Sequence, residues 1–305
     1  MPTVNQAALE NDHLLRGVWE GLGSPKCHIT GGYVRDRLLG QESVDLDLVL
    51  PGDIEILAGS ARRLAARLDA RVHVLGRDTN RVWRIECPEI KIELWPLGDL
   101  SLDEDIKRRD FSCNAIFWQL PHGPLDDRIG GLEDLENGLI RALSKRNIGD
   151  DPVRLLRGPR FLAQLEGYDL DPETADWIGS LAPAVSKAPR ERIGQELLKL
   201  LDAPGAADGL RSLLDLGLLE SAAPRSARFD RDWIERNFNA AASLSGSAPH
   251  PVTEAIRAGG SAPHLALILR AWGCPDADAV APFAWSRTER RHAARAAALL
   301  GRALR

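Results

Sequence analysis

Two aspartates stand two positions apart in an apolar run, and this spacing could support metal chemistry. They are Asp45 and Asp47. Because side chains alternate between the faces of a strand, a strand here would direct both carboxylates to one face. Val44, Leu46 and Leu48 would then point into a core. Carboxylate oxygens held on rigid backbone are ligands that Mg²⁺ prefers, so the run predicts a divalent-cation site.

A glycine pair precedes these aspartates. Gly31 and Gly32 are followed by Arg35 and Asp36. A Gly-Gly turn that opens a helix gives phosphate groups access to backbone N–H donors. Together with the two aspartates, it indicates metal-assisted chemistry on a nucleotide.

A third carboxylate, Glu93, lies in a later alternating run, on the polar face opposite Ile92 and Leu94. Two-metal phosphoryl or nucleotidyl transfer needs about three carboxylates that converge on the ions. Glu93 is therefore the candidate to complete the set begun by Asp45 and Asp47. The alternative is that these three residues are solvated structural acids.

A basic run precedes another predicted strand. It contains Lys107, Arg108 and Arg109, followed by Asp110 and Asn114. Arginines can hold a triphosphate, and an asparagine can hydrogen-bond a ribose hydroxyl. A solvated basic turn is the alternative interpretation.

A further polar segment begins at Asp151, which can cap a helix with Pro152 in its first turn. Arg154 and Arg157 then share a helix face, and Arg160 follows. Most such segments are capped surface helices. The functional alternative is that Asp151 and Arg154 read the edge of a base, one accepting from an amino group and the other donating to ring acceptors.

Composition allows a sizeable core and two or three subdomains. The chain has 305 residues, of which 44% are hydrophobic and 27% charged, with a formal net charge of −5. Residues 281–305 hold six arginines against one acid, a basic segment that either meets phosphate or forms a solvated face. The cysteines lack metal-ligand spacing, and no apolar run reaches the length of a membrane span. We expect a soluble cytoplasmic protein that does not act at a membrane.

The hydrophobic periodicity predicts an α+β region followed by helices. The expected strands are residues 27–30, 44–50, 71–75, 81–85, 90–94 and 115–120, with a hairpin turn at 76–80. The expected helices are 7–22, a helix capped by Asp53 that runs to about residue 68, 133–138, 152–166, 173–181, 190–202, 207–219, 230–242, 252–258, 264–272 and 287–304, with a loop at 243–251. This order is typical of an α+β domain with a mixed sheet and flanking helices, joined to an all-helical remainder.

Taken in order, these segments resemble the class II tRNA nucleotidyltransferase and bacterial poly(A) polymerase family, within the polymerase-β-like superfamily. The resemblance rests on five motifs: Gly31-Gly32-x-Val34-Arg35-Asp36 with Asp45-x-Asp47, Arg108-Arg109-Asp110-Phe111-Ser112-x-Asn114-Ala115, the hinge-like segment 126–135, Asp150-Asp151-x-x-Arg154, and Glu191-Arg192-Ile193-x-x-Glu196-Leu197. It covers about residues 25–202.

The resemblance implies an enzyme that extends an RNA 3′ end, above all that of tRNA, with C or CCA from CTP and ATP, and no nucleic-acid template. Asp45, Asp47 and Glu93 would be catalytic and bind Mg²⁺. The residues implied in nucleotide binding are Gly31, Gly32, Arg35, Asp36, Arg108, Asp110, Asn114, Asp151, Arg154, Arg157 and Arg160. The implied division is a catalytic head at 1–130, a neck that selects the nucleotide at 131–202, and an abbreviated helical body at 203–305 that could contact RNA.

Four departures from the family pattern matter. Asp150 replaces Glu and Ser112 replaces Thr, and both changes keep the chemistry. Pro159 follows Gly158 in the neck and predicts a kink, because proline lacks an N–H donor. The segment 94–107 is shorter than the loop usual in CCA-adding members and resembles enzymes that add only CC. A poly(A) polymerase and a catalytically inactive RNA-binding relative stay open as alternatives.

Overall fold

The computed structural model describes residues 4–76, 81–223 and 232. By its internal contacts the chain divides into two compact units, residues 1–143 (unit 1) and 144–305 (unit 2), and each is described by itself. The expected boundaries at residues 130 and 202 stay predictions. Cys274, the loop at 243–251, the basic segment 281–305 and the helices expected beyond residue 229 lie outside the described residues.

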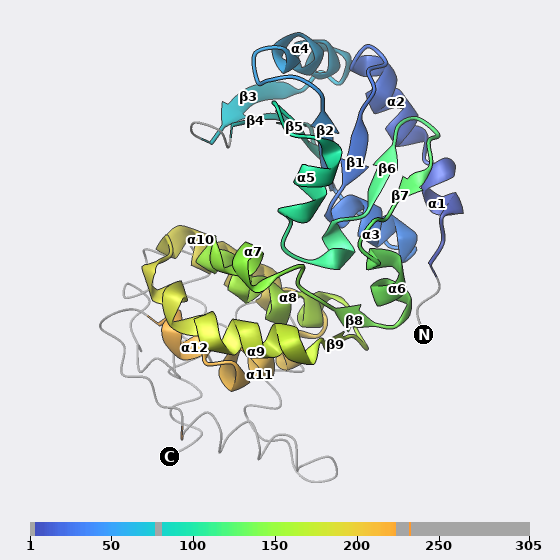
Figure 1. Ribbon diagram of the computed structural model, residues 1–305. Coiled ribbons are helices and arrows are strands. Elements are labelled where there is room, and N and C mark those ends of the chain that lie inside the picture. Colours follow the sequence, from blue (N-terminus) through green and yellow to red (C-terminus); the bar gives the residue numbers. More distant parts are fainter. Residues whose placement is uncertain (1–3, 77–80, 224–231, 233–305) are drawn as a thin grey trace. The chain divides into compact units, whose positions relative to one another are not determined.

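Unit 1 is built on a seven-stranded mixed sheet (Figure 1). In spatial order its strands are β3 (Arg71–Leu75), β4 (Val82–Glu86), β5 (Lys91–Pro96), β2 (Asp45–Leu50), β1 (His28–Thr30), β6 (Phe117–Gln119) and β7 (Leu125–Asp126). The β2–β5 pair is parallel and the other pairs are antiparallel. The predicted α+β class is confirmed, and the short β7 is a strand that the sequence pattern did not indicate.

Short helices surround this sheet. They are α1 (Ala7–Glu10), α2 (His13–Gly21), α3 (Gly32–Leu38), α4 (Leu57–Arg67), α5 (Leu102–Lys107), the 3-10 helix η2 (Ser112–Asn114) and α6 (Gly131–Glu136), with a two-residue strand β8 (Leu139–Ile140) at the end of the unit. Helix α3 packs on β1 and β2, and α4 packs on β3, β4 and β5 (Figure 1). The single helix predicted at 7–22 is two helices, because Asp12 caps α2 by accepting from Leu14 N at 3.1 Å.

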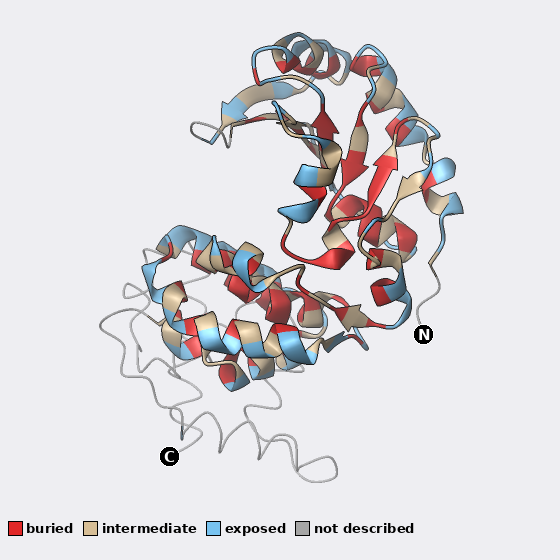
Figure 2. Ribbon diagram, in the orientation of Figure 1, coloured by how far each residue is buried: buried red, intermediate tan, exposed pale blue. Residues whose placement is uncertain are grey.

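The two faces of β2 have different neighbours. Leu46 and Leu48 on one face are fully buried, as predicted. On the other face Asp45 and Asp47 are followed by Val49, which packs with Ile106 of α5 and Phe117 of β6. Figure 2 shows the buried residues concentrated in this central part of the sheet. Helix α5 therefore covers the face that carries the aspartates, one step along the strand from them.

The prediction that Val44 faces a core is wrong. Its side chain is 63% exposed, because strand pairing begins only at Asp45, where the β2–β5 register starts. The carbonyl of Val44 nevertheless accepts from Lys91 N at 2.8 Å, so the start of β2 is held against β5.

Unit 2 is mainly helical over its described residues. Its elements are α7 (Lys145–Gly149), η3 (Pro152–Leu156), α8 (Arg157–Gln164), a two-residue strand β9 (Asp169–Leu170), α9 (Pro172–Leu181), η4 (Ala182–Lys187), α10 (Arg190–Leu201), α11 (Ala206–Asp215) and α12 (Leu218–Ser221). In the parts of the chain described here, no helix is long and apolar enough to cross a membrane.

The helix predicted at 152–166 is divided. Asp151 caps the 3-10 helix η3 with Pro152 in its first turn, as predicted, but the chain turns α-helical only at Arg157. Pro159 therefore lies in the first turn of α8, where a missing N–H donor costs nothing. The break that proline was expected to cause inside one helix is a junction between two helices.

Candidate active site

Two of the predicted metal ligands lie side by side on parallel strands. Asp47 of β2 and Glu93 of β5 are register partners, and Asp45 shares the face of Asp47. Burial raises the pKa of Asp47 to about 6, and the negative charges of Glu93 and Asp45 add to this shift. Arg109 and a hydrogen bond from Trp95 oppose it. Both other carboxylates thus act on Asp47 through their charge.

The Gly-Gly turn lies beside the Asp47 carboxylate. Gly31 has a φ of 76°, a conformation that side-chain-bearing residues rarely adopt. A Cβ atom at Gly31 would stand 2.9 Å from Asp47 Oδ2, and one at Gly32 would stand 3.5 Å from Arg35 Nη2. Glycine at 31 is required both by the backbone and by the space beside the carboxylate.

Arg35 hydrogen-bonds two other predicted nucleotide-binding residues, Asp36 and Asn114. Its side chain is buried, and its Nε and Nη2 bind Asp36 Oδ1 at 2.8 and 2.6 Å. Its Nη1 donates to Asn114 Oδ1 at 2.8 Å. The start of α3 and the η2 turn, far apart in sequence, are therefore held together at the glycine turn.

The basic run is organised by Asp105, a buried residue of α5. Arg108 donates to Asp105 Oδ1 from Nε at 2.8 Å and from Nη2 at 2.5 Å. Arg109 donates to Oδ2 of the same carboxylate, at 3.2 and 2.9 Å. Although burial alone would raise it, the pKa of Asp105 is lowered by these two guanidinium groups. Each arginine is held by one carboxylate oxygen.

Arg109 was not assigned a nucleotide-binding role by the resemblance. Unlike Arg108, it acts on Asp47 through its charge. Its guanidinium stands 4.7 Å above the Phe117 ring, its Nη1 donates to the carbonyl of Asn114 at 3.4 Å, and its charge acts on Asp47. Arg108 is half exposed. Asp110 is buried and accepts from the backbone N–H of Phe111 at 2.8 Å.

The predicted base-reading residues of unit 2 are ordered by neighbours within that unit. Both oxygens of Asp151 accept from Arg192 of α10, at 3.2 and 2.5 Å, and Oδ1 also accepts from Val153 N at 3.2 Å. Burial tends to raise the pKa of Asp151, but Arg192 outweighs it and the pKa is lowered. Arg154 donates to the carbonyl of Asn147 at 2.8 Å.

Arg157 and Arg160 are also brought together, by Glu196 of α10. The Nε atoms of the two arginines lie 3.7 and 3.3 Å from the oxygens of this buried carboxylate. Helix α10, which carries both Arg192 and Glu196, thus orders three of the four predicted residues of unit 2: Asp151, Arg157 and Arg160.

Two families of known domains match this chain. A model of the poly A polymerase head domain matches residues 27–141, and a model described as a probable RNA and SrmB-binding site of polymerase A matches residues 167–229. The CC-adding tRNA nucleotidyltransferase of Synechocystis sp. is 34% identical over 198 residues, 64% of this chain and 46% of the relative. The A-adding enzyme of Deinococcus radiodurans is 36% identical over 207 residues, 66% of this chain and 45% of the relative.

The chain belongs to the class II tRNA nucleotidyltransferase and poly(A) polymerase family. Poly(A) polymerase I of Salmonella typhimurium is also similar, at 29% identity over 67% of this chain and 48% of the relative. The chain spans about half the length of these curated members.

Solved structures share the fold. A tRNA-processing enzyme in its apo form I superposes with a TM-score of 0.71 at 23% identity. The superposition covers 98% of this chain and 80% of the chain of that enzyme. A CCA-adding enzyme in complex with CTP gives a TM-score of 0.63 at 20% identity, covering 100% and 86%.

The donor set at the strand ends suits the divalent ion that the family implies. All three candidate ligands are carboxylates, and a buried Asp47 next to like charge gains from a neighbouring cation. Within the described residues, however, no group of three or more His, Cys, Asp or Glu side chains is gathered to hold a metal ion. Asp45 instead pairs with Lys91, and Glu93 with Arg84.

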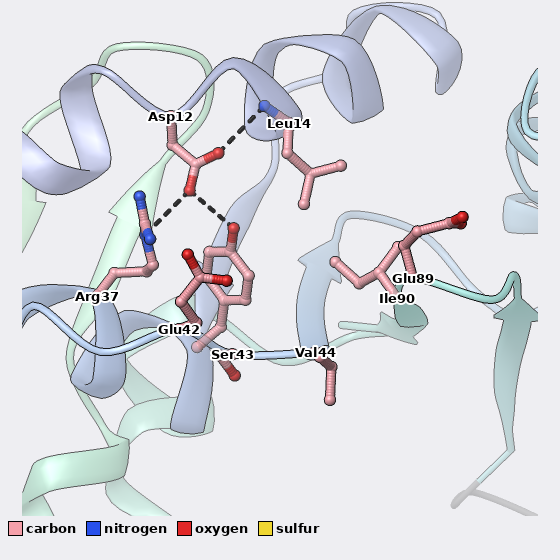
Figure 3. Close-up of a pocket in the computed structure, with 9 residues that line it drawn as sticks. Asp12, Leu14, Arg37, Glu42, Ser43, Val44, Glu89 and Ile90 are labelled. Atoms are coloured by element: carbon pink, nitrogen blue, oxygen red, sulfur yellow. Dashed lines mark hydrogen bonds and ion pairs between the residues drawn. The ribbon is translucent and has the colours of Figure 1, made fainter.

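A pocket of about 240 Å³ lies beside this region but contains none of the predicted site residues (Figure 3). It is lined by Asp12, Leu14, Tyr33, Arg37, Glu42, Ser43, Val44, Glu89 and Ile90. Asp12 accepts from Tyr33 Oη at 2.8 Å and pairs with Arg37 at 3.1 Å (Figure 3). Both partners belong to α3, so this network anchors the helix that begins at the glycine turn.

The sequence pattern missed Arg84, Lys91 and Asp105, and it indicated Arg109 only as a member of the basic run. A signal for Arg84 was present, because β4 and β5 are joined by a short turn. Counting back from that turn pairs Glu86 with Lys91 and Arg84 with Glu93, as the structure has them.

Proposed function

We propose that this chain is a template-independent RNA 3′-end nucleotidyltransferase that depends on Mg²⁺ and adds C to the 3′ end of tRNA. The observation that carries the proposal is the register of Asp47 and Glu93 on parallel strands, with Asp45 on the same face and the glycine turn against Asp47. The similarity of this chain to nucleotide-adding relatives supports it.

In the proposed reaction, the RNA 3′-hydroxyl oxygen forms a bond to the α-phosphorus of a nucleoside triphosphate. The bond between that phosphorus and the oxygen bridging to the β-phosphate breaks, pyrophosphate leaves, and the hydroxyl proton is lost to solvent. Bound Mg²⁺, held by Asp45, Asp47 and Glu93, would supply charge neutralisation and lower the pKa of the hydroxyl.

The other residues of unit 1 bind and orient the nucleotide in this proposal. The absence of side chains at Gly31 and Gly32 lets the triphosphate approach the N-terminus of α3. Arg35 and Asp36 order this turn, while Asp110 and Asn114 position the sugar. The guanidinium groups held by Asp105 supply positive charge to the phosphates.

Base selection is assigned to Asp151 and Arg154, with Arg157 and Arg160 supporting that surface. A carboxylate accepts from the cytosine or adenine amino group, and a guanidinium donates to ring acceptors. Arg154→Ala should reduce the ratio of kcat/KM for CTP over UTP about tenfold, since one good base contact is worth roughly 1–3 kcal/mol. Arg146→Ala, 87% exposed on α7, is the matched control. An unchanged ratio in Arg154→Ala would remove this residue from base reading.

The short connection between β5 and α5 favours addition of C without A. Only residues 97–101 separate the two elements. The sequence identity to this chain is nevertheless about equal for an A-adding and a CC-adding relative, and only slightly lower for a poly(A) polymerase. The added nucleotides are therefore the property to measure first.

The deciding experiment supplies the chain with tRNA that lacks its 3′ CCA or with tRNA that ends in CC, with CTP, ATP, both or neither, in the presence and absence of Mg²⁺. Products are resolved to single nucleotides. Addition that stops after two C residues is expected. A single A on a tRNA ending in CC would indicate the A-adding specificity, and long A tails a poly(A) polymerase. No metal-dependent extension of any tRNA would contradict the proposal and leave a catalytically inactive RNA-binding relative.

A further inference from the structure

Two of the three candidate metal ligands already hold a cation of the chain itself. Glu93 Oε1 accepts from Arg84 Nε at 3.0 Å and from Nη2 at 2.5 Å, and Asp45 forms an ion pair with Lys91. Asp47 differs, since its side chain accepts a 3.4 Å hydrogen bond from Trp95 and makes no ion pair within the described part of the chain. The two flanking carboxylates thus have ion-pair partners among the described residues, whereas Asp47 has only the more distant charge of Arg109.

The Arg84–Glu93 pair is built into the sheet. The two residues are register partners on adjacent antiparallel strands β4 and β5, and β5 pairs on its other side with β2 (Figure 1). The Glu93 side chain is only 12% exposed and that of Arg84 29%. Two donors of one guanidinium converge on one carboxylate oxygen, a charge-assisted arrangement that is stronger than a single hydrogen bond. A divalent ion that uses Oε1 must replace both donors.

Arg84 has a second acceptor within reach. Glu86 stands two residues along β4, on the same face, and its Oε1 lies 3.7 Å from Arg84 Nη1. Glu86 is about half exposed and also lies 3.8 Å from His73 Nε2. A guanidinium released from Glu93 therefore meets another carboxylate on its own strand, β4.

From these contacts we propose that Arg84 competes with the divalent ion for Glu93, and that Glu86 takes over the guanidinium when the ion binds. Arg84 is in this sense a positioning residue that sets how tightly the free protein holds metal. The inference rests on the proposed metal-dependent function and adds a regulation of the same site. It requires no group beyond Arg84, Glu86 and Glu93.

The test measures Mn²⁺ binding to the full chain without nucleotide or RNA, by the electron paramagnetic resonance signal of free Mn²⁺. In Arg84→Gln the Kd should fall about threefold, because a partly exposed ion pair no longer competes with the ion. Arg81→Gln is the matched control, because Arg81 directly precedes β4 and pairs with Glu55 at 3.3 Å instead of with Glu93. Its Kd should stay at the wild-type value.

Glu86→Gln should act in the opposite direction and raise the Kd, because Arg84 then stays on Glu93. Glu55→Gln controls for the loss of one negative charge. Arg84→Lys, which keeps the charge but cannot donate twice from one planar group, should give a Kd between those of wild type and Arg84→Gln. It also serves if Arg84→Gln does not fold, as judged by thermal unfolding.

An unchanged or higher Kd in Arg84→Gln, or an equal fall in Arg81→Gln, would overturn the inference. Its failure is separable from that of the proposed function. If the wild-type chain extends tRNA but Arg84→Gln binds Mn²⁺ like wild type, only the competition by Arg84 is wrong. If Mn²⁺ binding changes as expected but no RNA is extended, the competition stands and the proposed reaction is wrong.

Discussion

In unit 1 the candidate metal-binding carboxylates stand on strands, whereas in unit 2 Asp151 and Glu196 stand beside or on helices, and the two groups meet arginines differently. Asp47 is surrounded by like charge, and its pKa is raised to about 6. Both carboxylate oxygens of Asp151 accept hydrogen bonds from Arg192, and the pKa of Asp151 is lowered. The first arrangement leaves negative charge for an external cation to neutralise. The second is satisfied internally and presents a fixed surface.

The largest expected effect comes from removing the central charge of unit 1. Asp47→Asn should lower nucleotide incorporation about a thousandfold, because several kcal/mol of metal-supplied stabilisation is lost. It should not lower the unfolding temperature, since the substitution relieves repulsion with Glu93 and Asp45. Labelled-nucleotide incorporation and thermal unfolding measure the two effects. A folded and active Asp47→Asn protein would remove the distinction drawn between the two units.

Gly31→Ala should have the next largest effect. The new Cβ would meet Asp47 Oδ2 at 2.9 Å and displace the carboxylate, and a misplacement of about 1 Å can cost roughly a hundredfold in rate. Gly40→Ala is the control, with a similar φ of 72° and nothing within 4 Å of its Cβ. Both variants should lose stability from backbone strain, and Gly31→Ala should lose more because a φ of 76° with a ψ of −148° is adopted almost only by glycine, but only Gly31→Ala should lose activity. Equal activities would show that the glycine turn does not position Asp47.

Asp105→Asn tests the arginine pair that borders the carboxylates. It should raise the KM for the triphosphate about tenfold, the equivalent of one lost charge-assisted contact of roughly 1.4 kcal/mol. Stability should fall by about 2 kcal/mol, less than for a fully buried pair because Arg108 is half exposed. Asp103→Asn, an exposed residue that pairs with Lys107, is the control. A change in stability without any change in KM would make Asp105 purely structural.

The smallest effect is expected in unit 2. The pKa of Asp151 is lower in the folded state than in the unfolded chain. The Asp151–Arg192 ion pair therefore stabilises the protein fully at pH values above the unfolded pKa, and this stabilisation is lost as the pH falls through the folded pKa. Arg192→Gln should therefore be less stable than wild type by about 0.5 kcal/mol at pH 7, since both side chains are partly exposed.

The difference between Arg192→Gln and wild type should shrink as the pH falls below about 4, near the unfolded pKa of an aspartate. Denaturant unfolding at several pH values measures it. Arg146→Gln, whose partner Asp150 is exposed, should match wild type at every pH. A constant difference across the range would mean that Arg192 does not act through the Asp151 charge.

The elements that carry the chemistry were predictable because they depend on local signals. The alternation around Asp45 and Glu93, the cap at Asp151 and the glycine turn each involve residues close in sequence. Whether these residues act as assigned is what the variants above must test.

The remaining features depend on tertiary pairing. Val44 belongs to the apolar pattern of its strand but is exposed, because its side chain lies before the first paired residue of β2. Lys91 meets Asp45 only through the parallel β2–β5 register, whose two strands are separated by α4 and a hairpin. Asp105 is one of three consecutive acids in α5, and nothing local distinguishes it from the other two; its burial follows from the packing of Ile106 on Val49 and Phe117.

The turn between β5 and α5 has a consequence for changing the length of this chain. Gly98 is exposed, has a φ of 60°, and a Cβ atom placed on it would have nothing within 4 Å. Leu97 and Leu102 on either side pack against the Val49–Ile106–Phe117 cluster. Extra residues inserted after Asp99 would loop outward between two anchored ends. The length of this loop can thus be changed without moving the residues packed on either side of it.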